Sequence, residues 1–419
     1  MGFQVKEDGN WRSFRHRNYR ILFPANTVSN IGSWAQRIAQ DWLVLELTDN
    51  NGTYLGLVTA VQFAPVLLFS LHGGKLADRF NKRKVLVLTN ILGGSASLGL
   101  GALVITEHIQ LWHVFALAAV LGISTAIDAP VRQSFTTEVV GQTDLPNAVS
   151  LNSANFNAGR LIGPAVSGGL IAAFGTGPSF IINGLSYFFV IAALLNLNEK
   201  AFFHQDRAKS DGNIREGLAY AKARPDIYVV MLMVFFLATF GLNFQIFNAL
   251  MATQEFKLGP ASFGLMGTFI AIGSLTGAIG SARLERFRNT KFVIRGGIAF
   301  SATIIVLSVL PNYISYVIWL PICGLTALTT LVSANSIVQT STDPAIRGRV
   351  MGLYLLIFMG GTPFGSPLIG TSTELIGIRP TIALCGGIAL LASLFIWFKY
   401  KNRVELPADT SVAAVLKDR

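Results

Sequence analysis

Three ionisable side chains inside long apolar runs of this chain could form an ion pair, exchange a proton or bind an opposite charge. Arg37 and Asp41 are one helical turn apart, a spacing that lets the two charges pair on one helix face. We expect either a self-neutralising pair or a titratable switch. Arg160 lies near the middle of a later apolar run. Because a charge in that setting is costly, Arg160 is expected either to face a water-filled cavity or to anchor one helix on another.

Amide and hydroxyl side chains extend these charged positions into polar stripes. Asn26, Asn30, Ser33 and Arg37 recur at the spacing of one helix face, so the first apolar run has a polar side. Two later runs carry amides as well. The candidate substrate or coupling residues are Asn30, Arg37, Asp41, Arg160, Asn243, Gln245 and Asn335.

Composition identifies the elements that must hold these residues. The 419-residue chain is 52% hydrophobic and 13% charged, with a mean hydropathy of +0.52, whereas about 25% of residues are charged in a soluble domain. Apolar runs of about 20 residues, long enough to cross a bilayer, number six before the polar segment 198–226 and six after it. We therefore expect an all-α membrane protein with twelve transmembrane helices.

The distribution of Lys and Arg predicts how these helices are oriented. Alternate connections are rich in Lys and Arg, and the intervening ones carry only Lys257 and Arg379. Short connections rich in these residues stay in the cytoplasm, which places both termini there and the protein in the plasma membrane. The net charge of +11 is thus a topology signal and gives no reason to expect nucleic acid. No cleavable signal peptide is expected, because the first apolar run is too long for one.

The two halves follow one plan. Each has a basic connection after its second run and a fifth run that mixes Gly with Pro, which favours two pseudo-symmetric six-helix bundles around a central cavity, as in many secondary transporters. A short surface helix is expected over "IREGLAYAKARP", ending at Pro225. The predicted parts are a cytoplasmic segment 1–20, a first bundle 21–197, a linker 198–226, a second bundle 227–400 and a cytoplasmic tail 401–419.

Neither an ATP-driven pump nor a membrane enzyme fits the motifs. The chain has no G-x-x-x-x-G-K-[ST] phosphate loop, no H-E-x-x-H and no G-x-S-x-G, and its five histidines are scattered. Cys323 and Cys385 lie inside apolar runs and are expected to act as small hydrophobes. We expect no cofactor, no metal site and no catalytic residue.

The basic connection between the second and third runs carries the most specific motif. Its sequence "GKLADRFNKRK", Gly74 to Lys84, resembles the G-x-L-A-D-R-x-G-R-K signature of the major facilitator superfamily. Asn81 stands where the second glycine is usual, and Asn tolerates a left-handed backbone well. The stretch from Asp128 to Ile171, with "RGRVMGLY" farther on, is similar to the bacterial exporter branch that includes enterobactin-type siderophore and drug exporters.

This resemblance implies a secondary active transporter that exports a small siderophore-like or drug-like molecule by alternating access, driven by an ion gradient. Protons and membrane lipids are the other expected partners, and the protein is expected to be a monomer. An uptake carrier, or a non-transporting sensor or scaffold on the same fold, remains the alternative. The fourth run, "ALAAVLGIS", lacks the arginine of the R-x-x-Q-G motif of proton-coupled drug exporters.

The resemblance also implies a conformational latch in the basic connection. Asp78 would engage a neighbouring helix, with Arg132 as its candidate partner, unless these charges only fix topology. Asp128 is expected to be a structural acid that holds the end of the fourth helix, also with Arg132. The predicted latch residues are Gly74, Asp78, Arg79, Arg83, Lys84 and Arg132.

The fifth run is similar to the G-P-x-x-G-G antiporter motif, with one more residue between Pro and the glycine pair. Small residues let helices approach to backbone contact, so this helix is expected either to flex between the halves and favour export or to pack tightly. The predicted interface residues are Gly159, Gly163, Pro164, Gly168 and Gly169.

The charges of Arg37, Asp41 and Arg160 predict the charge of the substrate. Arg37 and Arg160 face only one acid close in sequence, Asp41, so a cavity that they line would favour anionic or catecholate-like compounds over cations. If Arg160 instead pairs with a neighbouring helix, the cavity is nearly neutral and hydrophobic cations could also pass.

Overall fold

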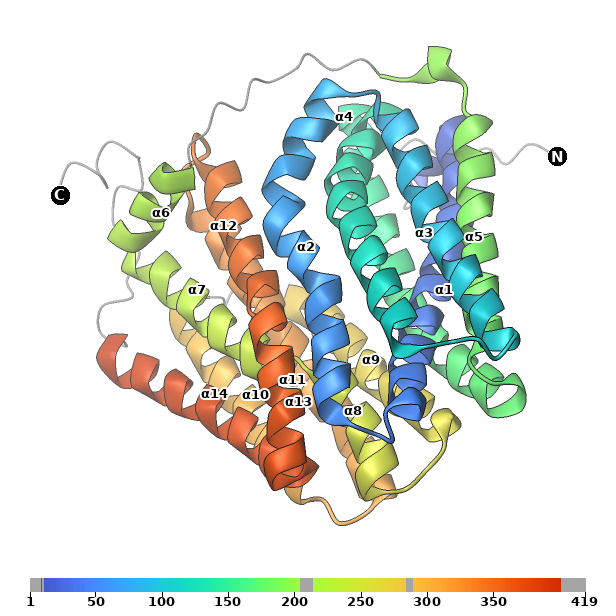
Figure 1. The fold of residues 1–419 in the computed structure, drawn as a ribbon. Helices are drawn as coiled ribbons and strands as arrows, with labels where there is room; N and C mark the ends of the chain where they lie inside the picture. Colours follow the sequence, from blue (N-terminus) through green and yellow to red (C-terminus); the bar gives the residue numbers. More distant parts are fainter. Residues whose placement is uncertain (1–8, 10, 204–213, 284–288, 401–419) are drawn as a thin grey trace. The chain divides into compact units, whose positions relative to one another are not determined.

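The computed structural model describes residues 9, 11–203, 214–283 and 289–400, and only the backbone course at 70–79, 214–215 and 282–283. Over these residues the secondary structure is helical, with short connections (Figure 1). The first half contains a short 3-10 helix, Arg12–Arg15, followed by five long helices. These are α1 (Arg17–Leu47), α2 (Gly52–Arg79), α3 (Lys82–Ile105), α4 (Leu111–Phe174) and α5 (Gly177–Leu195).

The helix α4 comprises two spans joined at a kink. Its 64 residues are about three times the roughly 20 that one bilayer crossing requires, and Gly141 interrupts the helical backbone with φ 72° and ψ 171°. Glycine adopts this conformation without the clash that a Cβ would cause. The ring of Phe203 packs against Gly141, and the Phe203 amide donates to the carbonyl of Glu138 at 2.8 Å. The fourth and fifth spans therefore meet at a sharp turn.

The second half begins with α6 (Ile214–Ala223), which confirms the short helix expected in the linker. Its first span is broken: α7 (Pro225–Phe236) continues into the π-helical turn η3 (Leu237–Gly241), and α8 (Phe244–Leu250) continues into η4 (Met251–Glu255). The remaining helices are α9 (Pro260–Arg283), α10 (Thr290–Val309), α11 (Tyr313–Ser341), α12 (Arg347–Gly360), α13 (Thr362–Ile376) and α14 (Ile378–Tyr400).

Twelve spans can be counted in the part that the structure describes. Ten helical stretches are long and apolar enough to cross a membrane, and the segment Leu111–Phe174 among them contains two spans. The helix α1, 31 residues long but more polar, is the twelfth. The prediction of an all-α membrane protein with twelve helices is confirmed.

Contacts divide the chain into two compact units. The first, called unit 1, comprises residues of Met1–Asp49, Ala64–Ala208 and Gly259–Thr268. Unit 2 comprises residues of Asn50–Phe63, Lys209–Leu258 and Phe269–Arg419. The predicted bundles 21–197 and 227–400 differ from these units in the first part of α2 and of α9, and the predicted boundaries stay a prediction.

Glycine contacts explain why the first part of α2 packs in unit 2. A Cβ added to Gly56 would collide with the backbone of Ser366, and one added to Gly52 would lie 3.0 Å from the carbonyl oxygen of Gly370. Both partners belong to α13, so α2 and α13 meet at backbone distance there. The Glu374 carboxylate also accepts from the Gly52 amide at 2.7 Å.

One local expectation was wrong. Asn81 is not left-handed: with φ −65° and ψ 112° it is the N-cap of α3, and its side chain accepts from the Lys84 amide at 3.1 Å. Capping of a helix N-terminus is the common role of Asn at such a position. Arg132 lies inside α4, because the helix continues to Gly141.

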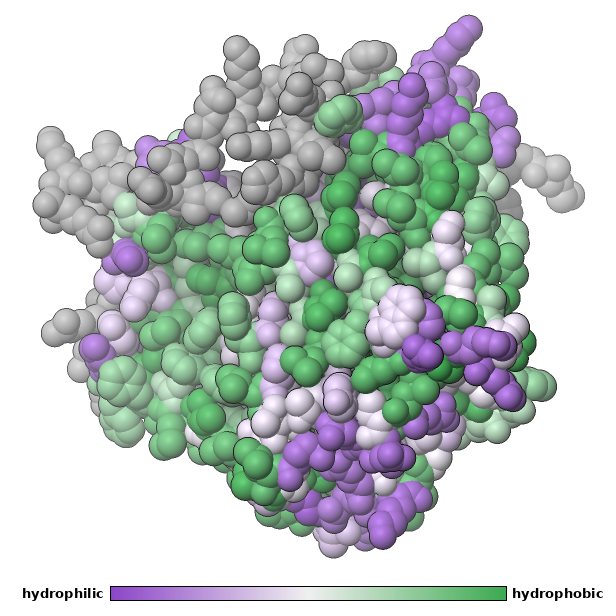
Figure 2. All heavy atoms as spheres, viewed as in Figure 1, coloured by the Kyte–Doolittle hydropathy of each residue, from purple (hydrophilic) through white to green (hydrophobic). Residues whose placement is uncertain are grey.

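Apolar side chains cover much of the visible surface along the helices, whereas hydrophilic ones gather near helix ends (Figure 2). Large exposed hydrophobic residues include Leu68, Phe189 and Leu391, each more than 60% exposed. Exposed apolar surface of this extent suits contact with lipid. The orientation of the termini stays a prediction.

Candidate substrate and coupling site

The first polar group of unit 1 surrounds Trp34 of α1 and is here called the Trp34 cluster: Trp34, Arg37, Phe156 and Arg160. The guanidinium carbon of Arg37 lies 5.0 Å from the centre of the indole ring, and that of Arg160 lies 6.0 Å from it. The ring of Phe156 meets the indole edge-on, with centroids 5.5 Å apart. Two arginines that the sequence predicted separately thus share one aromatic ring.

Glycines of α4 create the space for Trp34. A Cβ added to Gly163 would lie 2.5 Å from the Trp34 Cβ, and one added to Gly159 would lie 3.1 Å from the indole. Any larger residue would push α1 and α4 apart. These two predicted interface glycines therefore position the Trp34 cluster.

The other predicted interface residues contact α9 or nothing. A Cβ added to Gly168 would lie 2.9 Å from the carbonyl oxygen of Pro260, and Pro164 packs against Gly264 and Gly267. A Cβ added to Gly169 would meet no atom within 4 Å. Four of the five predicted residues thus lie at close helix contacts.

The pair Arg37 and Asp41 is brought together as predicted. Asp41 is only 3% exposed and acts electrostatically on the Arg37 guanidinium. Farther along the stripe, the Asn30 side-chain amide donates to the carbonyl of Asn155 at 3.0 Å. The polar face of α1 therefore contacts α4.

The second polar group, here called the Arg132 cluster, comprises Asn26, Thr89, Asn90, Asp128 and Arg132. Arg132 donates to both carboxylate oxygens of Asp128, at 2.7 and 2.9 Å, and to Asn26 at 2.7 Å. Thr89 donates to the same carboxylate at 2.9 Å, and Asn90 at 3.3 Å. The hydrogen bonds of Asp128 and Arg132 thus connect α1, α3 and α4.

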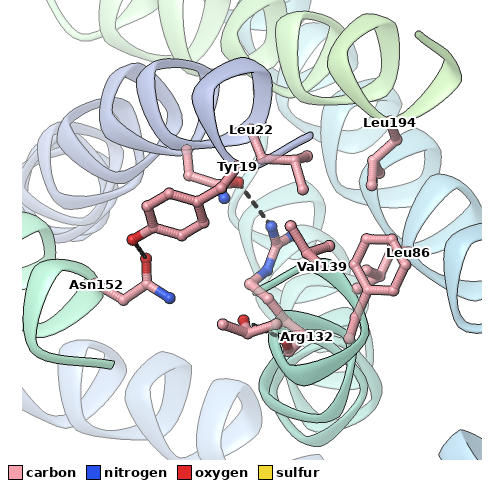
Figure 3. A pocket seen from close by; sticks show the side chains of 10 residues that line it. Tyr19, Leu22, Leu86, Arg132, Val139, Asn152 and Leu194 are labelled. Carbon is pink, nitrogen blue, oxygen red and sulfur yellow. Dashed lines mark hydrogen bonds between the residues drawn. The ribbon is translucent and has the colours of Figure 1, made fainter. Parts of the chain in front are cut away.

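A small pocket of unit 1 lies beside the Arg132 cluster (Figure 3). Arg132 points toward it, and Tyr19 and Asn152 lie across from Arg132, joined by a hydrogen bond of 3.1 Å. Apolar side chains close the pocket on the other sides, Leu22, Leu86 and Val139 among them. It thus combines the guanidinium of Arg132, the phenol of Tyr19 and the amides of Asn26 and Asn152 with an apolar wall.

Tyr187 of α5 lies between the two polar groups. Its hydroxyl lies beside the side chains of Ser33 and Asn183 and within electrostatic reach of Asp128 and Arg132. Tyr187 also lies within electrostatic reach of Arg37. The room for its ring comes from Gly93 of α3, where an added Cβ would lie 3.2 Å from the ring. Sequence reasoning missed Tyr187, because an aromatic residue in an apolar run resembles a core residue.

The predicted polar residues of unit 2 are used inside that unit. Asn243 lies at the break between η3 and α8 and donates to the carbonyl of Thr239 at 2.8 Å. Gln245 also has a polar partner. The Asn335 side chain lies beside the hydroxyl of Tyr354, which donates to the carbonyl of Leu331 at 3.4 Å. Asn243 and Gln245 lie at the start of α8 and Asn335 lies in α11, and no hydrogen bond described here joins Asn335 to the other two.

The predicted latch is described only in part. Only the backbone course is described at Gly74, Asp78 and Arg79, so the contacts predicted for Asp78 and Arg79 lie outside the described part of the chain. Arg83 pairs with the Glu199 carboxylate and donates to the carbonyl of Leu195 at 2.6 Å. Lys84 is exposed in the first turn of α3. Arg132, the candidate partner of Asp78, is bound by Asp128, the pairing that was also expected for Asp128.

Sequence reasoning also missed a charged group at the kink of α4. The Asp144 carboxylate, buried outside the membrane spans, accepts from Arg15 at 2.7 Å and contacts the His16 ring nitrogen at 2.6 Å, with Arg12 at 3.4 Å. Burial alone would raise the pKa of Asp144, but the bonds and charges of His16 and Arg15 outweigh it and lower the pKa below its ordinary value. This group fixes the N-terminal segment on α4.

No group of three or more His, Cys, Asp or Glu side chains suited to a metal ion occurs within the described part of the chain. The donor groups of the site are amides, guanidiniums, hydroxyls and single carboxylates. Such groups suit an organic ligand or a proton.

Comparison with known proteins agrees with this geometry. Residues 8–416 match the family described as transmembrane secretion effector, within the major facilitator superfamily. The chain belongs to this family. The resemblance of the basic connection to the superfamily signature is thereby confirmed, and the family is one of transporters rather than enzymes.

Similar proteins of this kind include exporters of siderophores and drugs. The staphyloferrin A transporter of Staphylococcus aureus is 22% identical, over 94% of this chain and 98% of its own length. The multidrug efflux pump Tap of Mycolicibacterium fortuitum is 24% identical, over 92% and 96%. The enterobactin exporter EntS of Escherichia coli O1:K1 is 21% identical, over 85% of each.

Solved structures show the same fold. A bacterial homologue of the human lysosomal transporter Spinster superposes with a TM-score of 0.74 at 14% identity, over 96% of this chain and 98% of that one. The secretion-effector chain is thus a multi-pass membrane transporter with the major facilitator fold.

Proposed function

We propose that this protein is a secondary active exporter of a small organic molecule, siderophore-like or drug-like, which it moves by alternating access. The observation that carries the proposal is the match along nearly the whole chain to proteins named for the export of enterobactin and of drugs. Because identity to each is 21–24%, the relatives support the class of substrate and no single compound.

We also propose that a proton gradient drives transport. Asp41 is buried and acts electrostatically on Arg37, and Asp128 is bound by Arg132, so unit 1 holds two acids whose protonation would remove a charge that stabilises an arginine. Tyr187 lies within electrostatic reach of Arg37 and of the Asp128–Arg132 pair. A proton on either acid would free an arginine, and a change in helix packing could follow from that release.

Vesicle transport tests direction and coupling together. Inside-out vesicles from a host without its own exporters should accumulate a substrate found by screening a deletion strain, and a protonophore should abolish the accumulation. Accumulation only in right-side-out vesicles would indicate an uptake carrier. Accumulation in neither orientation, across the screened compounds, would indicate a sensor or scaffold.

The latch belongs to the same proposal. Asp78→Asn should lower transport about tenfold or more while expression stays nearly intact, because the proposed latch would lose its acid and the substitution keeps the size of the side chain. Arg132→Ala should have a similar effect. If Asp78→Asn transports at the wild-type rate, the basic connection is only a topology signal.

Location and assembly are proposed as well. The Lys and Arg pattern supports a plasma-membrane protein with both termini in the cytoplasm. We further propose a monomer with six-helix bundles at 21–197 and 227–400.

A further inference from the structure

The two arginines of the Trp34 cluster carry more positive charge than the neighbouring side chains balance. Both guanidiniums lie against one indole, at 5.0 and 6.0 Å, and the charge of Arg37 acts unfavourably on Arg160. Two like charges beside the same ring repel each other unless an anion compensates them. Asp41 compensates Arg37.

Arg160 has no such partner among the described residues. Its contacts there are the indole of Trp34 and the repulsion from Arg37. The other acid of this region, Asp128, already accepts from Arg132, Thr89 and Asn90. The Trp34 cluster therefore lacks one negative charge.

The exposed side of Arg160 is best explained by water. Arg160 is half-buried in the second span of α4, and an unpaired arginine facing acyl chains at that depth is costly. A water-filled path removes that cost and gives a solute access to the guanidinium. Phe156, one helical turn before Arg160, is 51% exposed beside it.

We propose that the Trp34 cluster binds the anionic group of a flat aromatic substrate, such as an aromatic carboxylate. The anion would lie between Arg160 and Arg37 and make charge-assisted hydrogen bonds, and its ring would pack on Phe156 and the edge of Trp34. The proposal rests on the export function above and names its substrate class. Gly159 and Gly163 hold Trp34 in place, so the site is formed before the ligand arrives.

Binding to the full chain in lipid nanodiscs tests this site. Three probes share one ring system and differ in charge: 2-naphthoate is an anion, 2-naphthamide is neutral and 2-naphthamidinium is a cation. Isothermal titration should show 2-naphthoate binding roughly tenfold or more tighter than 2-naphthamide, since hydrogen bonds to charged groups contribute that much. The cation should bind most weakly.

Variants assign the preference to Arg160. Arg160→Gln should remove the preference for 2-naphthoate over 2-naphthamide, and Arg160→Lys should keep part of it, which would exclude misfolding as the cause. Trp34→Phe should weaken all probes and keep the charge preference. Arg295→Gln is the matched control, because Arg295 also stacks on an indole, that of Trp397 at 5.2 Å, but in unit 2.

Two results would overturn the site. One is equal affinity of the wild-type protein for 2-naphthoate and 2-naphthamide, including no binding of either. The other is an unchanged preference in Arg160→Gln. Vesicle transport tests the export function separately. Binding of 2-naphthoate without energised accumulation of any substrate would reject export and keep the site. Accumulation of a substrate without a preference for the anionic probe in binding would keep export and reject the site.

Discussion

At the scale of single residues, the arginines of unit 1 differ in how their charge is balanced. Arg132 has a bidentate carboxylate partner four residues away on the same helix, a spacing visible in the sequence. Its bond to Asn26 could not be predicted, because the two residues are far apart in the chain. Neither could the shared ring of Trp34, since a tryptophan in an apolar run gives no sign of which cations it meets.

Removing the Asp128 carboxylate should destabilise the packing of α1, α3 and α4, which its hydrogen bonds and those of Arg132 connect. Asp128→Asn leaves Arg132 without its two charge-assisted acceptors, so we expect the free energy of unfolding to fall by about 1–3 kcal/mol. The measurement is the thermal transition of the purified protein in detergent. Glu199→Gln is the control, because it removes the carboxylate paired with Arg83. The Glu199 side chain is 66% exposed, so its loss should lower the free energy of unfolding by less than about 1 kcal/mol. Equal shifts in both variants would contradict the proposed role.

Asp144 should make the attachment of the N-terminal segment sensitive to acid. Its folded pKa is lowered, so its stabilising contribution is complete above its ordinary pKa of about 3.9 and is lost as the pH falls through the lowered folded value. Hydrogen exchange of the amides at residues 12–16 should therefore show weaker protection at acidic pH. Asp144→Asn should show weak protection already at neutral pH. Protection in that variant equal to wild type at neutral pH would reject the anchoring role.

At the scale of helices, apolar length predicted the spans, and local backbone chemistry set their details. The kink at Gly141 and the break between η3 and α8 lie inside stretches whose composition does not separate a bend from a straight helix. The capping role of Asn81 was missed, because the resemblance drew attention to the glycine it replaces. Glycine positions were predictable, but the partners that require them were not.

The contrast between two glycines of α4 tests helix packing. Gly163→Ala places a methyl group 2.5 Å from the Trp34 Cβ, so α1 must move, and we expect a loss of about 1–3 kcal/mol of stability. Gly169→Ala meets no atom within 4 Å and should be neutral or slightly stabilising. Thermal unfolding of both variants makes the comparison. A stable Gly163→Ala protein would mean that α1 and α4 pack less tightly than described.

At the scale of the whole molecule, the polar segment 198–226 and the repeated plan of spans predicted two halves, and the count of twelve helices is confirmed. Composition did not predict that parts of α2 and α9 pack with the other half of the chain. That arrangement depends on contacts such as that between Gly56 and Ser366, which lie more than half the chain apart.

Orientation in the membrane is tested at two connections. Reporter fusions at Asn51 and Gly259 should both report the outer side, because these connections carry almost no Lys or Arg. Alkaline phosphatase, active only outside, and green fluorescent protein, fluorescent only inside, give opposite signals at one site. A cytoplasmic signal at either position would reject the predicted topology.

The division of α2 between the two units has a mechanical consequence. The boundary falls between Phe63 and Ala64, and Pro65 follows at once inside the same helix. Because α2 belongs to both units, a rotation of one unit against the other would either bend this helix or change which of its residues pack in each unit. Proline lacks the amide that would tie the helix to the preceding turn, which lowers its bending stiffness there. The position at which α2 bends most easily, Pro65, therefore lies next to the point in the chain where unit 2 gives way to unit 1.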